Sequence, residues 1–193
     1  MTKTEPKDEF IRQILEAHNR RRKAHESPEL HYSEELEMLA QEWAERCAKH
    51  AHIMFSEISG IGENITFFPK TIDPESIVEH WYSEHVKYEF ETPGWQPNTN
   101  YFTQVIWKAT EEVGIGRAWV EEETEENHNF DKNHLHFNHP HHKNGHRITG
   151  KIADEGDQVV VAFYRPAGNS NRAGQFAVNV KKPEKTKWIE QPD

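Results

Sequence analysis

The order of the local patterns along the chain limits its fold more than any other feature. Apolar residues recur at helical spacing in the first half, whereas the clearest apolar runs bounded by turn residues come after residue 112. Strands and helices do not alternate, as they do in chains that build parallel sheets from repeated strand-helix-strand units. The order therefore predicts helices packed on an antiparallel sheet, which is an α+β fold.

Four segments are expected to be helical. The first begins near Phe10 and ends in a basic turn at residues 18–22, which suits the negative end of the helix dipole. Ser33 is a candidate N-cap for the second helix, and Asp73 followed by Pro74 marks the start of the third. The second helix is expected to have an apolar face of Leu36, Leu39, Ala40, Trp43, Ala44 and Cys47. That of the third consists of Ile77, Val78, Trp81, Val86 and Tyr88, and that of the fourth of Val105, Ile106 and Trp107.

Strand patterns are clearest at residues 113–120 and 158–164, and residues 65–68 have the pattern of a shorter strand or an extended loop. Residues 121–156 separate the two clear strands, which a compact sheet would join by a short hairpin loop. This segment begins with the acidic run 121–126, and we interpret it as a histidine- and glutamate-rich insertion. Its histidines are His128, His134, His136, His139, His141, His142 and His146.

The charge balance and the cysteine content exclude some classes of protein. The formal net charge is −10, from 23 basic and 33 acidic side chains, whereas a nucleic-acid-binding chain needs a basic face. Cys47 is the only cysteine, so no disulfide can form within the chain. Its place on an apolar helix face indicates a buried, unreactive thiol rather than a nucleophile.

The N-terminal residues carry no signal for export or lipid attachment. Residues 1–7 lack the apolar core of a signal peptide, and no segment is apolar for long enough to span a bilayer. Thr2 occupies the position at which N-myristoylation requires glycine. We therefore expect an intracellular protein, with export by an unconventional route left open.

Four motifs carry a family resemblance, at residues 18–22, 62–65, 101–107 and 161–169. In combination they are similar to the signatures of the CAP superfamily, also called the SCP domain, which includes cysteine-rich secretory, antigen 5 and pathogenesis-related 1 proteins. The resemblance covers roughly residues 8–180, apart from the insertion. It implies a three-layer α-β-α sandwich with a central antiparallel sheet.

The same resemblance suggests how the chain is organised and where it resides. Residues 1–180 are expected to form a single CAP domain that contains the insertion at about 121–156, followed by a polar tail at 181–193. The absence of disulfides and of a leader is similar to the Golgi-associated plant pathogenesis-related subgroup and to intracellular venom-allergen-like proteins. That similarity implies a location in the cytoplasm or at the periphery of Golgi membranes.

The resemblance also implies a central cavity lined by two histidines and two glutamates. Three of these positions match His52, Glu63 and Glu84, and the fourth falls on Tyr101. His50 is a near neighbour that takes the place of His52 if the alignment slips. No cofactor is required by this set, and a divalent metal such as Zn²⁺ would be held weakly through His52, because neutral phenol is a poor ligand near pH 7.

The insertion offers a second candidate metal site. The spacing of its histidines suits chelation of Ni²⁺, Cu²⁺ or Zn²⁺, whereas the simpler interpretation is a solvated polar loop whose imidazoles have no collective role. The candidate ligands are His134, His136, His139, His141 and His142.

The leading functional hypothesis is a non-enzymatic binding module. The resemblance implies binding of sterols, fatty acids or phospholipids, and of partner proteins. The candidate lipid-contacting residues are Phe90, Trp95 and Phe102, in and after a segment with the composition of an ordered surface loop. The alternative for these aromatic rings is that they simply fill the core.

Two other functions remain open at this point. One is a metal-assisted hydrolase that uses His52, Glu63 and Glu84 with a bound water as nucleophile, which Tyr101 disfavours. No serine lies in a nucleophile-elbow context, and Ser83 and Thr103 have no evident base nearby. The other is a protein-protein interaction module acting as a homodimer. The sequence cannot separate it from a lipid-binding module, because a lipid groove and a partner groove have the same composition.

Overall fold

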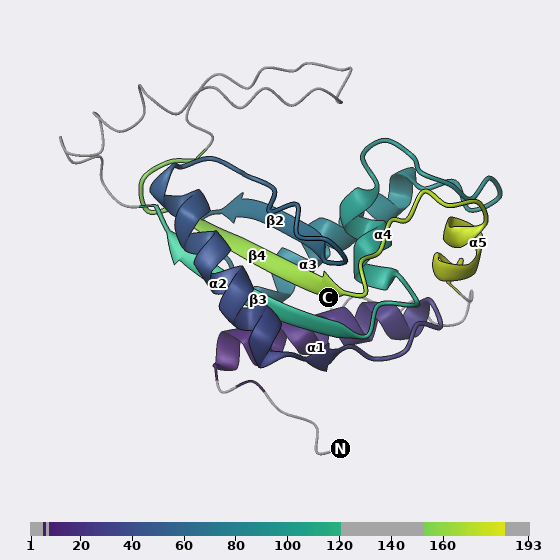
Figure 1. The fold of residues 1–193 in the computed structure, drawn as a ribbon, viewed down its shortest axis with the longest axis horizontal. Coiled ribbons are helices and arrows are strands. Elements are labelled where there is room, and N and C mark those ends of the chain that lie inside the picture. Colours follow the sequence, from purple (N-terminus) through teal and green to yellow (C-terminus); the bar gives the residue numbers. More distant parts are fainter. Residues whose placement is uncertain (1–5, 7, 121–152, 184–193) are drawn as a thin grey trace, which may run out of the picture.

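The structure, a computed structural model, describes residue 6, residues 8–120 and residues 153–183. Its elements follow one another as helices and strands that are mixed along the chain (Figure 1). They are α1 (Glu9–Ala24), β1 (His31–Tyr32), α2 (Glu34–Lys49), β2 (Gly62–Phe68), α3 (Pro74–Tyr82), the 3₁₀ helix η1 (Ser83–Lys87), α4 (Asn100–Ile106), β3 (Glu112–Trp119), β4 (Gln158–Arg165) and α5 (Gln175–Asn179).

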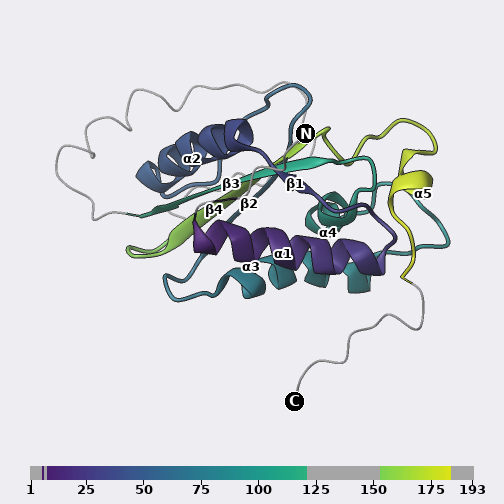
Figure 2. The same cartoon turned by 90° about the horizontal axis from the view of Figure 1, so that it is seen from below.

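The described strands form one sheet in the order β1-β3-β4-β2. β4 pairs antiparallel with both β3 and β2, whereas the two-residue β1 runs parallel to β3, with His31 opposite Glu112. Helix α2 covers one face of the sheet, and α1, α3 and α4 lie on the other (Figure 2). The predicted α-β-α sandwich is therefore confirmed, with β1 as the one parallel strand among those described.

Two glycines of β3 allow α2 to lie close against the sheet. A Cβ atom added to Gly114 would lie 2.1 Å from the backbone nitrogen of Glu37, and one added to Gly116 would lie 2.3 Å from the carbonyl carbon of Ala40. Small residues on the facing side of α2, such as Ala40 and Ala44, are buried there together with Cys47. Burial raises the pKa of the Cys47 thiol, as expected for an unreactive cysteine.

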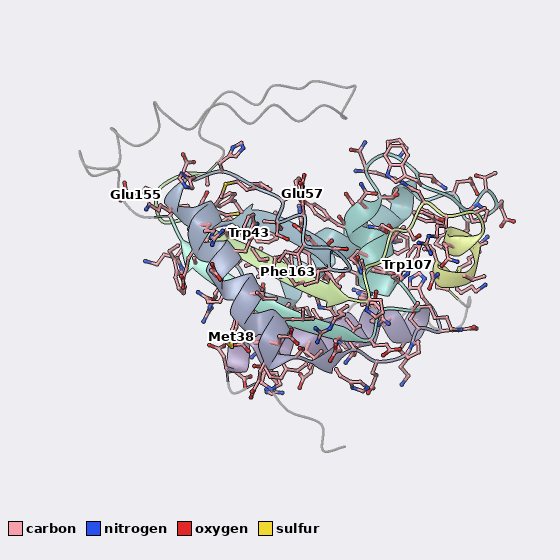
Figure 3. The ribbon with its side chains drawn as sticks, in the orientation of Figure 1. Met38, Trp43, Glu57, Trp107, Glu155 and Phe163 are labelled. Atoms are coloured by element: carbon pink, nitrogen blue, oxygen red, sulfur yellow. The ribbon has the colours of Figure 1, made fainter. Side chains whose placement is uncertain are left out.

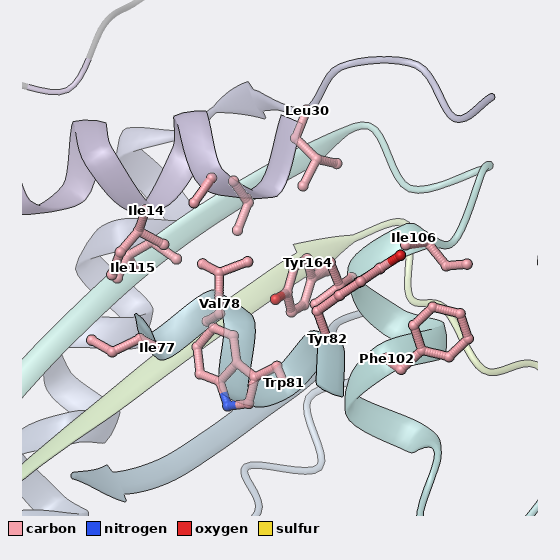
Figure 4. Packing of buried hydrophobic residues seen from close by; sticks show 14 of the residues in the cluster. Ile14, Leu30, Ile77, Val78, Trp81, Tyr82, Phe102, Ile106, Ile115 and Tyr164 are labelled. Carbon is pink, nitrogen blue, oxygen red and sulfur yellow. The ribbon is translucent and has the colours of Figure 1, made fainter. Parts of the chain in front are cut away.

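The opposite face of the sheet supports the larger core (Figure 4). Full burial of an aromatic or branched aliphatic side chain contributes roughly 1.5–3 kcal/mol, so this layer supplies much of the driving force for folding. Among its fully buried members are Ile14, Ile77, Val78, Trp81, Phe102, Ile106 and Tyr164.

The helix starts agree with their sequence signals. Ser33 Oγ accepts a hydrogen bond from the backbone N–H of Leu36 at the start of α2, and the Asp73 carboxylate accepts one from Ser76 at the start of α3. The third helix is shorter than predicted, because it tightens into η1 after Tyr82. Val86 is consequently 75% exposed rather than part of the apolar face.

Other boundaries differ by small amounts. β2 begins at Gly62, so the segment predicted to be a short strand or a loop is a complete strand. Trp107 is the C-cap of α4 and not a helical residue, although it is buried as expected. The sequence did not indicate β1 or α5, which are only two and five residues long. Residues 121–152 and 184–193, and with them the candidate histidine ligands of the insertion, lie outside the described residues.

Candidate binding site

Glu84 lies in η1, and its carboxylate caps the start of α4. Glu84 Oε2 accepts hydrogen bonds from the backbone N–H groups of Tyr101, at 2.8 Å, and Phe102, at 3.2 Å. The N-cap residue Thr99 offers no side-chain cap, so the acid from η1 satisfies donors that would otherwise lack a partner. This role accounts for an acid here without any catalytic function.

Tyr101 joins α4 to the edge of the sheet. Its hydroxyl donates a hydrogen bond of 2.8 Å to the carbonyl oxygen of Ile65 in β2, the last strand in the sheet order. Burial, helped by the nearby Glu84 carboxylate, raises the pKa of the Tyr101 phenol. The phenol is therefore neutral near pH 7, and its proton is engaged with the backbone.

The carboxylate of Glu63 holds the loop that precedes β2. It accepts hydrogen bonds from Ser56 N at 3.0 Å, from Ser56 Oγ at 2.6 Å and from Glu57 N at 3.1 Å. Side chains alternate between the two faces of a strand, and Glu63 pairs with Phe163, which belongs to the layer covered by α2. Glu63 thus points to the sheet face opposite the one that Asn64 faces.

Asn64 continues a buried polar network on that second face. Its Nδ2 donates to Tyr101 O, at 3.2 Å, and to the hydroxyl of Tyr164, at 3.3 Å, and Tyr164 in turn contacts His18 Nε2 at 2.8 Å. His18 Nδ1 lies 2.9 Å from Ile14 O, which can only accept, so the proton is assigned to Nδ1 and Tyr164 donates to Nε2. Burial lowers the pKa of His18 to about 4, which keeps this imidazole neutral.

His52 is not connected to the other three candidate residues by any described contact. It follows α2, is half-buried, and its backbone N–H donates to Cys47 O at 3.2 Å. Its imidazole forms no hydrogen bond or ion pair with another described residue. His50, the alternative candidate, is exposed at the C-cap of α2.

The structure thus brings Glu84 and Tyr101 together, anchors Tyr101 to the strand that carries Glu63, and leaves His52 unlinked. Within the described ranges, no three histidine, cysteine or acidic side chains are grouped so that they could hold a metal ion. Of the surface hollows, one of about 470 Å³ lies beside α1 and residues 29–32, and another of about 350 Å³ is lined by Phe10 and Trp119. None of the four candidate residues lines either hollow.

The three candidate lipid-contacting residues lie in different environments. Phe102 is fully buried in the core, and Phe90 packs on it edge to face with ring centroids 6.2 Å apart. The alternative that these rings fill the core therefore fits Phe102. Trp95, in contrast, is 57% exposed. We name residues 88–99 the Trp95 loop.

Internal hydrogen bonds order this loop. Gln96 accepts from Glu89 N at 2.8 Å and donates to the carbonyl oxygens of Glu89 and Thr92. The hydroxyl of Tyr88 accepts from Gly94 N at 3.3 Å. Trp95 is consequently presented by an ordered surface loop, as its composition predicts.

Comparison with known proteins places this geometry in a family. The family model described as "CAP: Cysteine-rich secretory protein family" matches residues 15–130. This chain belongs to the CAP family.

Related proteins match either most of this chain or only part of it. The human Golgi-associated plant pathogenesis-related protein 1 is 29% identical over 180 residues, which cover 92% of this chain and 96% of that protein. Protein PRY2 of Saccharomyces cerevisiae is 31% identical over 109 residues, which cover 56% of this chain but only 32% of the yeast protein.

Solved structures show the same fold at lower identity. The venom allergen-like protein 4 of Schistosoma mansoni aligns with a TM-score of 0.58 and 19% identity over 93% of this chain and 99% of its own. NaASP2, solved with Zn²⁺, aligns with a TM-score of 0.58 and 16% identity over 93% of this chain and 92% of its own. These similarities support the CAP fold and do not identify a ligand of this chain.

The CAP signatures contact one another around Gln104, a residue whose role the sequence did not reveal. Gln104 Oε1 accepts from Gly168 N at 2.9 Å, and Gln104 Nε2 donates to Thr110 Oγ1 at 3.3 Å. A Cβ atom added to Gly62 would lie 2.1 Å from Gln104 Oε1, and one added to Gly168 would lie 2.8 Å from the same amide. The glycines within two of the motifs, Gly62 and Gly168, were the available signal for this close approach.

Arg22 is a second structural residue within a CAP signature. It is buried and donates to four carbonyl oxygens, those of Pro28, Val105, Trp107 and Thr110, at 2.8–3.0 Å. Burial lowers its pKa to about 10, which still leaves it charged near pH 7. The sequence had indicated only a basic last turn, whereas the side chain ties α1 to the segment that follows α4.

Proposed function

We propose that this chain is a non-enzymatic CAP-domain binding protein that takes an apolar lipid, such as a sterol, fatty acid or phospholipid, or an apolar surface of a partner protein. The observation that carries this proposal is that the polar groups at the candidate site are engaged with backbone. Glu84 caps α4, Tyr101 donates to β2, and Glu63 holds the preceding loop. These contacts give each of the three groups a structural role.

The same contacts support the expectation that zinc would be held weakly. Zn²⁺ prefers imidazole, thiolate or free carboxylate ligands in a tetrahedral arrangement. At this site Tyr101 is neutral, both glutamates already accept two or more hydrogen bonds, and His52 is not joined to them. We therefore propose that these residues would hold the metal weakly at most, which disfavours the hydrolase alternative.

Trp95 supports the apolar ligand class. A tryptophan that is more than half exposed on an ordered loop is an amphipathic contact that suits a lipid or an apolar partner surface. By analogy with the human Golgi-associated relative, we also propose a location at the periphery of a membrane. No helix in the described ranges combines the length and the hydropathy needed to cross a bilayer. Homodimer formation through the same surface is part of this proposal and is tested by light scattering after size exclusion.

A binding assay with two matched tryptophan variants tests the proposal. Trp95→Ser should weaken retention of a fluorescent sterol or fatty acid at least tenfold. Trp119→Ser should leave retention unchanged, because Trp119 is also exposed, at 44%, but lies at the end of β3 and not in the loop. If the wild-type chain retains neither lipid at micromolar concentration, or if both variants lose it equally, the lipid proposal fails.

A further inference from the structure

His25 is a buried residue that the proposed function does not use, and the fold fixes its position closely. It is the C-cap of α1, and Glu26 after it adopts a left-handed conformation with φ of 57°. The backbone N–H groups of Glu26 and Ser27 return to the carbonyl oxygens of Lys23 and Arg22, which closes the helix end. The imidazole is therefore held in a fixed position at the C-terminal end of α1.

The two ring nitrogens of His25 bind two different segments. Nδ1 lies 2.6 Å from the carbonyl oxygen of Lys181, and Nε2 lies 2.9 Å from the hydroxyl of Tyr82 at the end of α3. A carbonyl oxygen only accepts, so Nδ1 carries the proton and Tyr82 donates to Nε2. Lys181 belongs to residues 180–183, which we name the strap, and within the strap Val180 and Pro183 are buried.

The ring of His25 contacts Phe90 of the Trp95 loop and Phe102 of α4. Phe90 stacks on the imidazole with ring centroids 6.3 Å apart, and Phe102 meets it edge to face at 5.5 Å. One buried ring therefore contacts both the strap and the loop. A direct ion pair of 3.1 Å between Lys182 and Glu91 also joins the two, but both side chains are exposed, so it contributes little.

We propose that the strap braces the Trp95 loop through His25, so that the loop presented to the ligand is positioned by the segment that follows α5. The assignment of the loop as the ligand contact rests on the proposed function, whereas the mechanical coupling does not. His25 is a positioning residue in this account and touches no ligand.

The chain offers a matched control for this coupling. His18 is also fully buried, also faces a carbonyl oxygen through Nδ1 and also receives a tyrosine hydroxyl at Nε2. Its ring lies against Trp81 and Tyr164, away from the strap and the loop. Replacing either histidine by phenylalanine removes the same two polar links from the core, but only His25→Phe removes the link between the strap and the loop.

Hydrogen exchange measured by mass spectrometry on the full chain tests the proposal. In His25→Phe, amide exchange should be at least tenfold faster than in the wild type both at residues 88–97 and at residues 179–183. His18→Phe should leave the ratio of these segments to the rest of the chain unchanged. His25→Gln, which restores one donor and one acceptor, should recover part of the protection.

A chain truncated after Val180 gives the same test if His25→Phe fails to fold, since it removes Lys181 and should loosen residues 88–97. The coupling is refuted if the loop keeps its protection in His25→Phe while the strap exchanges faster, or if the loop keeps its protection in the truncated chain. The exchange is measured without ligand, so its result is separate from lipid retention. A coupled loop in a chain that retains no lipid would sink the proposed function and leave the brace intact.

Discussion

Acidification should destabilise this domain mainly through two buried histidines. His18 and His25 are both fully buried, and burial lowers the pKa of each from its ordinary value of 6.5 to about 4. In the unfolded chain both imidazoles take up a proton as the pH falls below about 6.5, whereas in the folded chain they remain neutral down to about pH 4. Stability is therefore fully present above pH 6.5 and is lost as the pH falls toward 4.

The size of the effect follows from the same values. Each pH unit between the two pKa values corresponds to about 1.4 kcal/mol, so each histidine accounts for about 2 kcal/mol by pH 5 and about 3 kcal/mol by pH 4. Both together amount to about 6 kcal/mol at pH 4, which is comparable with the whole free energy of unfolding of a typical domain. We therefore expect the domain to be close to unfolding near pH 4.

Urea denaturation at pH 7.5, 6.5, 5.5 and 5.0 measures this loss over the upper part of the pH range in which it occurs. Carboxylates also titrate at acidic pH, so the comparison with a variant isolates the histidine. His18→Phe should be less stable than the wild type at pH 7.5, because Tyr164 loses its partner, but it should lose about 2 kcal/mol less between pH 7.5 and pH 5. An equal pH dependence in the variant and the wild type would refute the assignment of His18 as a buried neutral group.

Three further changes test individual contacts. Gly62→Ala should lower the free energy of unfolding by about 1–3 kcal/mol, because its Cβ would overlap Gln104, whereas Gly94→Ala, with nothing within 4 Å, should change it far less; equal effects in urea denaturation would contradict the close approach. Ala51→Gly should raise the thermal midpoint and the free energy of unfolding, the latter by about 1 kcal/mol, because Ala51 has a φ of 45° after the end of α2. A lowered midpoint would refute the backbone strain. Glu84→Ala should cost about 1 kcal/mol in urea denaturation and Glu84→Gln less, since the amide oxygen still accepts from α4. Equal costs in the two variants would show that the charge, and not the capping hydrogen bond, is what matters.

The layers of the fold could be predicted because their signals are local. Ser33 and Asp73 mark helix starts through side chains that bond to backbone three residues away, and a helical apolar face needs only its own spacing. The end of α3 was harder to predict, because no helix-breaking residue marks the change from α-helix to η1 after Tyr82. β1 is two residues long and exists only because β3 lies beside it.

The candidate site shows the limit of the same reasoning. The family resemblance placed Glu84 and Tyr101 at one site, and the structure joins them. The sequence could not show that the acid bonds to backbone N–H groups 17 and 18 residues further along the chain. Glu63 lies next to Asn64 in sequence, yet strand alternation sends the two side chains to opposite faces. Roles of this kind depend on which backbone groups lack partners, and those are known only once the elements are packed.

Zinc titration by calorimetry tests the central claim most directly. The chain used carries asparagine in place of the seven histidines of residues 121–156, so that only the folded site can respond. Because Glu63, Glu84 and Tyr101 are bonded to backbone, we expect no stoichiometric uptake of Zn²⁺. Uptake of one ion per chain that disappears in His52→Ala would contradict the account and favour the metal-assisted hydrolase over the binding module.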